Sequence, residues 1–269
     1  MATLTTEQGI VHYEAYGRGR PVLLLHGWLN SWALWRNSIE LLGRNFRTYA
    51  LDFFGFGDSD ARTEDFSVAN FGSMVNQFMD RMGIVKAPLI GHSMGGTVAL
   101  SVSMRYPEKV VKVGVVGSPI QGSSLRPLLR VAAYRGWAEL AEASPVLYDL
   151  FQKGFTPFLR GYSHFLARDG RALGDMLSAD AAKLAFGPFW ESINTLRNTD
   201  LTPHLSQVNV PVLAVYGKRD NIVDPRQHKI IKTHIPHSRI AWFENSGHFP
   251  MLDEPERFHN TLLDFLHNG

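Results

Sequence analysis

The sequence predicts an α/β protein with a mostly parallel central sheet, flanked by helices, and an inserted helical cap. Short apolar runs alternate with helical patterns as far as residue 116, which is typical of parallel strands joined by crossover helices. Residues 119–203 then read as helical and rich in aromatic side chains, before strand-like runs return. We therefore expect a core formed by residues 1–118 and 204–269, with residues 119–203 inserted into it as a cap.

The individual elements follow from their periodicity. The apolar runs that predict strands are 22–25, 48–51, 89–90, 111–116, 210–216 and 239–243. The patterns that predict helices in the core are 32–42, 68–82, 97–106 and 255–266. The helix at 68–82 is the clearest, because it has one apolar stripe, a plausible N-cap at Ser67 and a stop at Gly83.

Composition bounds the kind of protein and its partners. The chain has 269 residues, 45% of them hydrophobic, and a net charge of +2 without a dense basic cluster, which argues against nucleic acid as a partner. Because no leader segment, membrane-spanning run or cysteine is visible, we expect a cytoplasmic protein without stable membrane insertion. A basic amphipathic stretch is expected to form a solvated helix face, and it carries Arg126, Arg130 and Arg135. The oligomeric state is not predicted.

The pentapeptide Gly91-His92-Ser93-Met94-Gly95 is the most informative segment. It follows an apolar run and opens a helical pattern, and a serine at such a sharp turn holds its hydroxyl where it can attack a carbonyl. Glycines two positions before and after the serine would relieve the crowding of the turn. An ordinary glycine-rich connection is the alternative, so the interpretation of Ser93 depends on its partners.

A nucleophilic serine needs a base to take its proton and an acid to orient that base. In this kind of turn the chain order is serine, acid, histidine, with each partner in a loop after a strand. Asp220 and His248 meet both conditions with respect to Ser93. Asp224 is the alternative acid, but its position before Pro225 suits a helix N-cap instead.

Of the 11 histidines, only His248 combines a strand end with the expected chain order. His26 and His92 also follow predicted strands, but both precede Ser93 in the chain. One further group has no usual zinc spacing, and we therefore expect no metal site there: His228, His234 and His237.

Attack on an ester creates an oxyanion that requires preorganised N–H donors. The Met94 amide is one candidate, because it opens the helix after Ser93 and its N–H lacks an intrahelical acceptor. The Trp28 amide is the other, in the turn His26-Gly27-Trp28, where glycine lets the chain face inward. A simple strand-end turn with Trp28 in the core is the alternative.

These residues resemble those of the α/β-hydrolase-fold serine hydrolases, in particular small carboxylesterases and haloperoxidase-like perhydrolases. The motifs that carry the resemblance are HGW from residue 26, DFFGFGDS from 52, GHSMGG from 91, YGKRD from 216 and SGHFPMLDEP from 246. The resemblance implies the α/β-hydrolase fold, with the Trp28 and Met94 amides as oxyanion donors. It also implies that residues 52–59 shape a loop beside the site in a structural role.

Departures from sister families narrow the chemistry. Similar haloalkane dehalogenases and epoxide hydrolases use an aspartate where this chain has Ser93, and C–C bond hydrolases often have tryptophan where it has Phe249. We therefore expect a serine hydrolase that cleaves small-molecule carboxylic esters through an acyl-enzyme, without a cofactor. Two alternatives stay open: a ligand-sensing protein on the same fold, and C–C bond cleavage or cofactor-free perhydrolysis by the same residues.

The cap would supply the walls of the substrate pocket. We expect most of its aromatic side chains to pack the cap against the core, and the others to line an apolar pocket over Ser93. They are Phe151, Phe155, Phe158, Tyr162, Phe165, Phe186, Phe189 and Trp190.

Overall fold

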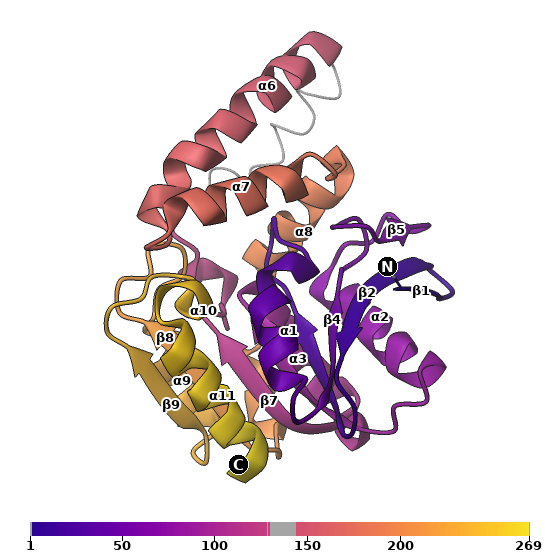
Figure 1. The fold of residues 1–269 in the computed structure, drawn as a ribbon, viewed down its shortest axis with the longest axis vertical. Helices are drawn as coiled ribbons and strands as arrows, with labels where there is room; N and C mark the ends of the chain where they lie inside the picture. The colour runs from indigo at the N-terminus through magenta and orange to yellow at the C-terminus, as the bar shows by residue number, and fades with distance from the viewer. Residues whose placement is uncertain (1, 128, 130–143, 269) are drawn as a thin grey trace.

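A central sheet organises the protein, whose computed structural model describes residues 2–127, 129 and 144–268 (Figure 1). Within these residues the sheet has nine strands: β1 Ala2–Thr5, β2 Gly9–Tyr16, β3 Pro21–Leu25, β4 Arg47–Leu51, β5 Asp60–Ala61, β6 Ala87–His92, β7 Val110–Val116, β8 Val212–Gly217 and β9 Arg239–Phe243. Their order is β1-β2-β4-β3-β6-β7-β8-β9, and β5 also pairs with β2. All neighbours from β4 to β9 are parallel. The predicted mostly parallel sheet is therefore confirmed.

The predicted strands are all present, as β3, β4, β6, β7, β8 and β9. The prediction missed β1, β2 and β5, which pair antiparallel at one edge of the sheet. This edge lacks the continuous apolar runs of buried parallel strands, because β2 has both buried and partly exposed positions and β5 has only two residues.

Helices cover the sheet on both faces (Figure 1). Those outside the stretch between β7 and β8 are α1 Arg36–Leu42, α2 Val68–Arg81, α3 Met94–Arg105, α9 Gln227–His234, α10 Pro250–Asp253 and α11 Pro255–Asn268. Helix α2 forms as predicted: the Ser67 hydroxyl accepts a hydrogen bond from the Asn70 amide at 3.1 Å, and Gly83 follows its end with a φ of 66°. Its stripe of Phe71, Val75 and Phe78 is fully buried, and the ring of Phe78 packs on Tyr13 of β2 and Tyr49 of β4.

Among the described residues, three further helices lie between β7 and β8 in the sequence, and we call them the cap helices: α6 Pro145–Tyr162, α7 Gly170–Ala181 and α8 Phe186–Asn198. Figure 1 shows α6 and α7 standing above the sheet. The helical character expected for this segment is found in its described part, but the division of the chain into core and cap stays a prediction. Two arginines of the predicted basic stretch, Arg130 and Arg135, lie outside the described part, as do the side chains of the cap aromatics Phe151 and Phe186.

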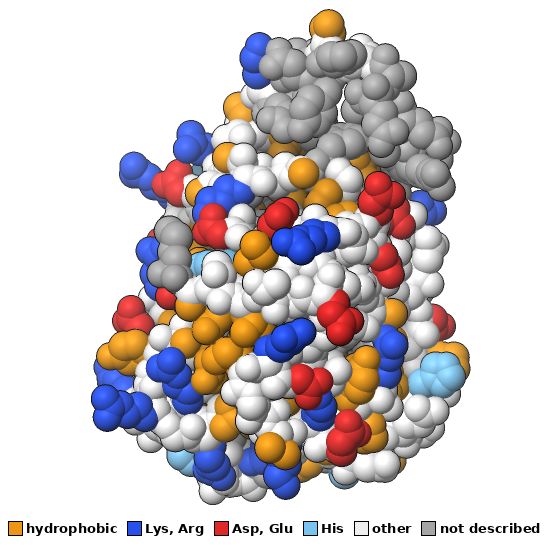
Figure 2. All heavy atoms as spheres, turned by 90° about the vertical axis from the view of Figure 1, so that its right-hand side faces the viewer, with side chains coloured by type: hydrophobic (Ala, Val, Ile, Leu, Met, Phe, Trp, Pro, Cys, Tyr) orange, Lys and Arg blue, Asp and Glu red, His pale blue; other side chains and the backbone are white. Residues whose placement is uncertain are grey.

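The surface carries charges of both signs. Lysine and arginine side chains are interspersed with aspartate and glutamate over the face shown in Figure 2. Among the described residues, no helix combines the length and the apolar character needed to cross a membrane.

Candidate active site

Ser93 lies at a sharp turn between β6, which ends at His92, and α3, which begins at Met94. Its backbone has φ 50° and ψ −120°, a conformation that is costly for a residue with a side chain. The Ser93 amide donates to the carbonyl of Val116 at 2.8 Å, which ties the turn to the end of β7. The strand-to-helix turn predicted from the sequence is therefore present, and it stores backbone strain at the serine.

The glycines that flank the serine are required by close backbone contacts. A Cβ on Gly91 would lie 2.2 Å from the carbonyl carbon of Gly95. A Cβ on Gly95 would lie 2.3 Å from the carbonyl oxygen of Leu25, on the neighbouring strand β3. Both distances are far below a van der Waals contact, so the turn closes only with glycine at these positions.

His248 and Asp220 form a buried pair, each with a relative exposure of 4%. The Nδ1 of His248 lies 2.8 Å from Oδ2 of Asp220, so Nδ1–H donates and Nε2 is left as the proton acceptor. The other oxygen of Asp220 accepts from the amides of Ile222 at 2.8 Å and Val223 at 2.9 Å. These bonds hold the carboxylate in one orientation.

The alternative acid, Asp224, is engaged elsewhere. Its carboxylate accepts from the amide of Arg226 at 3.0 Å and from the Nε of the same residue at 2.8 Å. The predicted helix start at Pro225 is wrong, because α9 begins at Gln227 with Arg226 as its N-cap. Asp224 instead stabilises the turn that precedes the helix.

The serine and the buried pair meet at the end of β7. Val116 accepts the hydrogen bond from Ser93, and the next residue, Gly117, has a φ of 57°. A Cβ on Gly117 would lie 3.2 Å from Nδ1 of His248 and 3.4 Å from Oδ2 of Asp220. Among the described residues, Ser93 Oγ makes no hydrogen bond to the His248 ring. Hydrogen bonds of this kind are often long without substrate and tighten in the complex.

The two predicted oxyanion donors flank the serine. The Met94 amide is the first of α3, and a Cβ on Gly27 would lie 3.0 Å from the Cβ of Ser93, which places the turn containing Trp28 beside the serine. The Trp28 side chain is half-buried, and its indole donates to the carbonyl of Phe189 on α8 at 3.0 Å. The Trp28 ring therefore faces the cap helices.

His92 contributes a contact that the sequence did not indicate. Its ring packs on those of His248 and Phe249, with centroids 4.7 and 4.8 Å apart. Its Nε2 donates to the carbonyl of His248 at 2.9 Å. Burial lowers the pKa of His92 well below its ordinary value, so the ring is neutral. Its position beside the serine was the only signal in the sequence.

His26 fixes the neighbouring turn in a similar way. Its Nε2 accepts from the Phe53 amide at 2.9 Å, so its Nδ1–H donates to the carbonyl of Gly27 at 2.7 Å. Burial lowers the pKa of His26, which keeps this ring neutral as well.

The loop at 52–59 is braced by Asp52. One oxygen of Asp52 accepts from the Trp32 amide at 2.6 Å, and the other accepts from the Asp58 amide at 3.0 Å and from His12 Nδ1 at 2.7 Å. The possible metal ligands of His12, Asp52 and Asp58 lie within 4.8 Å of one another. These hydrogen bonds tie the loop to His12 of β2 and to the Trp32 amide, which favours the structural role expected for this loop.

Comparison with known proteins identifies the family, because residues 20–255 match the alpha/beta hydrolase fold. The chain belongs to this family. This hydrolase is 26% identical to the pimeloyl-[acyl-carrier protein] methyl ester esterase of Aliivibrio salmonicida (strain LFI1238), over 95% of each chain. It is 23% identical to bifunctional epoxide hydrolase 2 of Sus scrofa over 95% of its own length but only 53% of that protein, so it spans about half of that relative. It also resembles the crystal structure of carboxylesterase CesB (YbfK) from Bacillus subtilis, with a TM-score of 0.78, 25% identity, and coverage of 100% of this chain and 91% of that one.

Proposed function

We propose that this hydrolase cleaves carboxylic esters of small molecules through an acyl-enzyme. The observation that carries the proposal is the buried His248–Asp220 hydrogen bond, at the same strand end as the strained turn of Ser93. A hydrogen-bonded acid and base beside a serine in such a turn is the arrangement that activates a hydroxyl for acyl transfer. Two of the relatives described above are named as esterases, which favours the same reaction class.

In the proposed mechanism, His248 Nε2 takes the proton of Ser93 Oγ as the oxygen attacks the ester carbonyl. The amides of Trp28 and Met94 stabilise the oxyanion of the tetrahedral intermediate. The imidazolium, held by Asp220, then gives its proton to the departing alcohol, leaving an acyl-serine. Water activated by the same histidine releases the carboxylic acid and restores the serine.

We also propose that residues 119–203 act as a cap over this site. Among the hydrogen bonds that join this region to the rest of the protein are three to the loops that follow β3 and β8. These join Trp28 to Phe189, the Ser31 hydroxyl to Asp180, and Asn221 to Phe165. A cap held in this position would determine which acyl groups fit.

A series of p-nitrophenyl esters of increasing acyl length tests the proposal, measured on the wild type and on Ser93→Ala. We expect turnover of at least some esters by the wild type and its loss in the variant. Ser103→Ala is the matched control, because Ser103 is a buried serine of α3, and among the described residues its hydroxyl bonds only the carbonyl of Leu100. Wild-type activity in Ser93→Ala would contradict the proposal. Absence of ester turnover, with peroxide-dependent halogenation or cleavage of a vinylogous diketone instead, would replace it with the corresponding alternative.

A further inference from the structure

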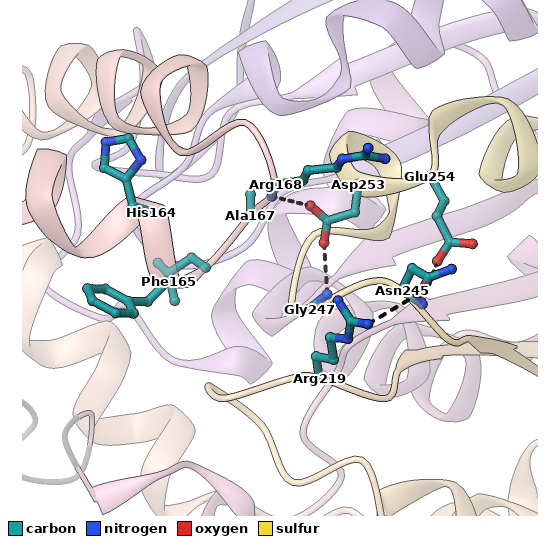
Figure 3. Close-up of a pocket in the computed structure, with 10 residues that line it drawn as sticks. His164, Phe165, Ala167, Arg168, Arg219, Asn245, Gly247, Asp253 and Glu254 are labelled. Carbon is teal, nitrogen blue, oxygen red and sulfur yellow. Dashed lines mark hydrogen bonds between the residues drawn. The ribbon is translucent and has the colours of Figure 1, made fainter.

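A short backbone segment between two cap helices lies against the loops that carry the proposed acid and base. This segment, residues 165–168, joins α6 to α7 (Figure 3). A Cβ on Gly247 would lie 2.9 Å from the carbonyl oxygen of Leu166, so the two backbones are close together. The Nδ2 of Asn221 donates to the carbonyl of Phe165 at 2.9 Å. Asn221 directly follows Asp220, and Gly247 directly precedes His248.

Asp253, at the end of α10, connects the same two segments through its carboxylate. One oxygen accepts from the amide of Arg168 at 2.6 Å, and the other accepts from the amide of Gly247 at 2.8 Å. Figure 3 shows the carboxylate lying between these two amides. Its relative exposure is 7%, and hydrogen bonds to a carboxylate in such a largely buried position are strong.

The carboxylate of Asp253 borders a cavity between the segment and the neighbouring loops. A cavity of about 590 Å³ opens beside it, between residues of the segment 164–168 and core residues that include Arg219, Asn245 and Glu254 (Figure 3). Side chains do not fill this space, so apolar packing does not hold the segment to the loop on that side. On that side the hydrogen bonds of Asp253 make the contact, while Leu166 and Ala167 of the same segment are buried in the hydrophobic core.

We propose that Asp253 is a positioning residue that couples the seating of the cap segment 165–168 to the placement of His248. The inference rests on the proposed function, because it assumes that His248 is the base. A displacement of this segment would move Gly247 through Asp253 and would strain the loop of Asp220 through Asn221. A displacement of about 1 Å in a catalytic group is enough to cost on the order of a hundredfold in rate. The position of the cap thus affects kcat as well as substrate binding.

Asp253→Asn tests the coupling, because it keeps the volume of the side chain but turns an NH₂ group towards one of the two amide donors. With p-nitrophenyl acetate, whose acyl group is too short to reach far into a cap, we expect kcat per active site to fall by about 10- to 100-fold. We expect KM to change by no more than about twofold. Active sites are counted by titration with a fluorophosphonate, so that inactive molecules do not lower the apparent kcat.

Lys183→Gln is the matched control. Lys183 of the cap bonds the carboxylate of Asp58 at 2.8 Å, so it also links cap and core, but it leads to neither Asp220 nor His248. We expect the kcat and KM of this variant to equal those of the wild type. If Asp253→Asn does not fold, Asn221→Ala decides, because it breaks the second link while leaving Asp253 in place; its kcat should fall in the same direction.

A folded Asp253→Asn protein with the kcat of Lys183→Gln would overturn the inference, as would an unchanged kcat in Asn221→Ala where Asp253→Asn does not fold. Equal losses of kcat in Asp253→Asn and Lys183→Gln would overturn it too, because they would reflect general loosening of the cap. Failure of the proposed function is distinguishable, because the wild type itself would then show no ester turnover and no labelling.

Discussion

The two buried carboxylates of Asp220 and Asp180 illustrate how local contacts decide the role of an ionisable residue. Asp220 has two backbone amides and an imidazole around it, which together hold it in one orientation. Asp180 of α7 has the Ser31 hydroxyl on one oxygen, while no hydrogen bond reaches the other among the described residues. Burial, more than any other cause, raises the pKa of Asp180 to about 6. The first carboxylate is suited to orient a base, and the second weakens the folded state when it is charged.

Replacing Asp220 by asparagine tests the first of these roles. The variant keeps the size of the side chain, but its amide can favour the wrong tautomer of His248. We expect kcat to fall by about 10³- to 10⁴-fold, with a melting temperature close to that of the wild type. Steady-state kinetics and thermal unfolding measure both quantities, and a loss of less than about threefold would be incompatible with the proposed role.

Asp180→Asn tests the second role through the pH dependence of stability. Because the folded-state pKa of about 6 lies above the ordinary value of 3.8, the stability linked to the protonated carboxyl is complete below about pH 4 and is lost as the pH rises through about 6. The neutral amide does not incur this loss. Chemical unfolding measures the free energy of unfolding of the variant minus that of the wild type. This difference should be higher at pH 8 than at pH 4 by about 2 to 3 kcal/mol. A difference that is the same at both pH values would exclude a raised pKa.

At the scale of elements, periodic patterns predicted α2 and the buried parallel strands well, because each depends on a face that is apolar along its whole length. The edge pair β1–β2 was missed, since its strands are only partly buried, and the start of α9 was misplaced because Asp224 caps a turn rather than the helix. The turn at Ser93 was predictable for a different reason. Its glycines are required by contacts within a few residues and with the adjacent strand β3. Such contacts fix the residue type at set distances from the serine, so they can be recognised as a local sequence motif.

Gly95→Ala tests how closely β3, β6 and α3 are packed at this turn. The added methyl group would lie 2.3 Å from the carbonyl oxygen of Leu25, so the helix must move away from the sheet. We expect the free energy of unfolding to fall by about 3 kcal/mol or more. Gly161→Ala, in α6, is the control: a methyl group there has no described atom within 4 Å, and the substitution should be neutral or slightly stabilising. Equal effects of the two substitutions on urea unfolding would show that the turn tolerates a side chain.

At the scale of the molecule, one general rule made the candidate site predictable: the loops after parallel strands gather at one edge of the sheet. By that rule the sequence predicts that the loops carrying Ser93, Asp220 and His248 lie close together. The rule could not reveal the contact of His92 with His248, of Asp253 with Arg168 or of Asp180 with Ser31. These contacts join residues that are from 85 to 156 positions apart in the chain. No local pattern encodes such contacts.

The junction of cap and core is also where we expect selectivity to arise. Phe189 of α8 is buried against the ring of Trp28, at 4.9 Å between centroids, and against Phe155 of α6 at 5.4 Å. Phe189→Ala would open space next to the turn that carries Trp28. We expect the ratio of kcat/KM for an octanoate to that for an acetate p-nitrophenyl ester to rise by about tenfold, since each accommodated methylene is worth roughly 1 kcal/mol or more. An unchanged ratio in a folded variant would place the acyl pocket elsewhere.

The most direct test of the account is to find the residue that becomes covalently modified. The wild-type protein is treated with a fluorophosphonate, digested, and the modified peptide sequenced by mass spectrometry. We predict a single adduct on Ser93, formed more slowly in Asp220→Asn and absent in Ser93→Ala. An adduct on another residue, or equal labelling of wild type and Ser93→Ala, would contradict the assignment of Ser93 as the nucleophile.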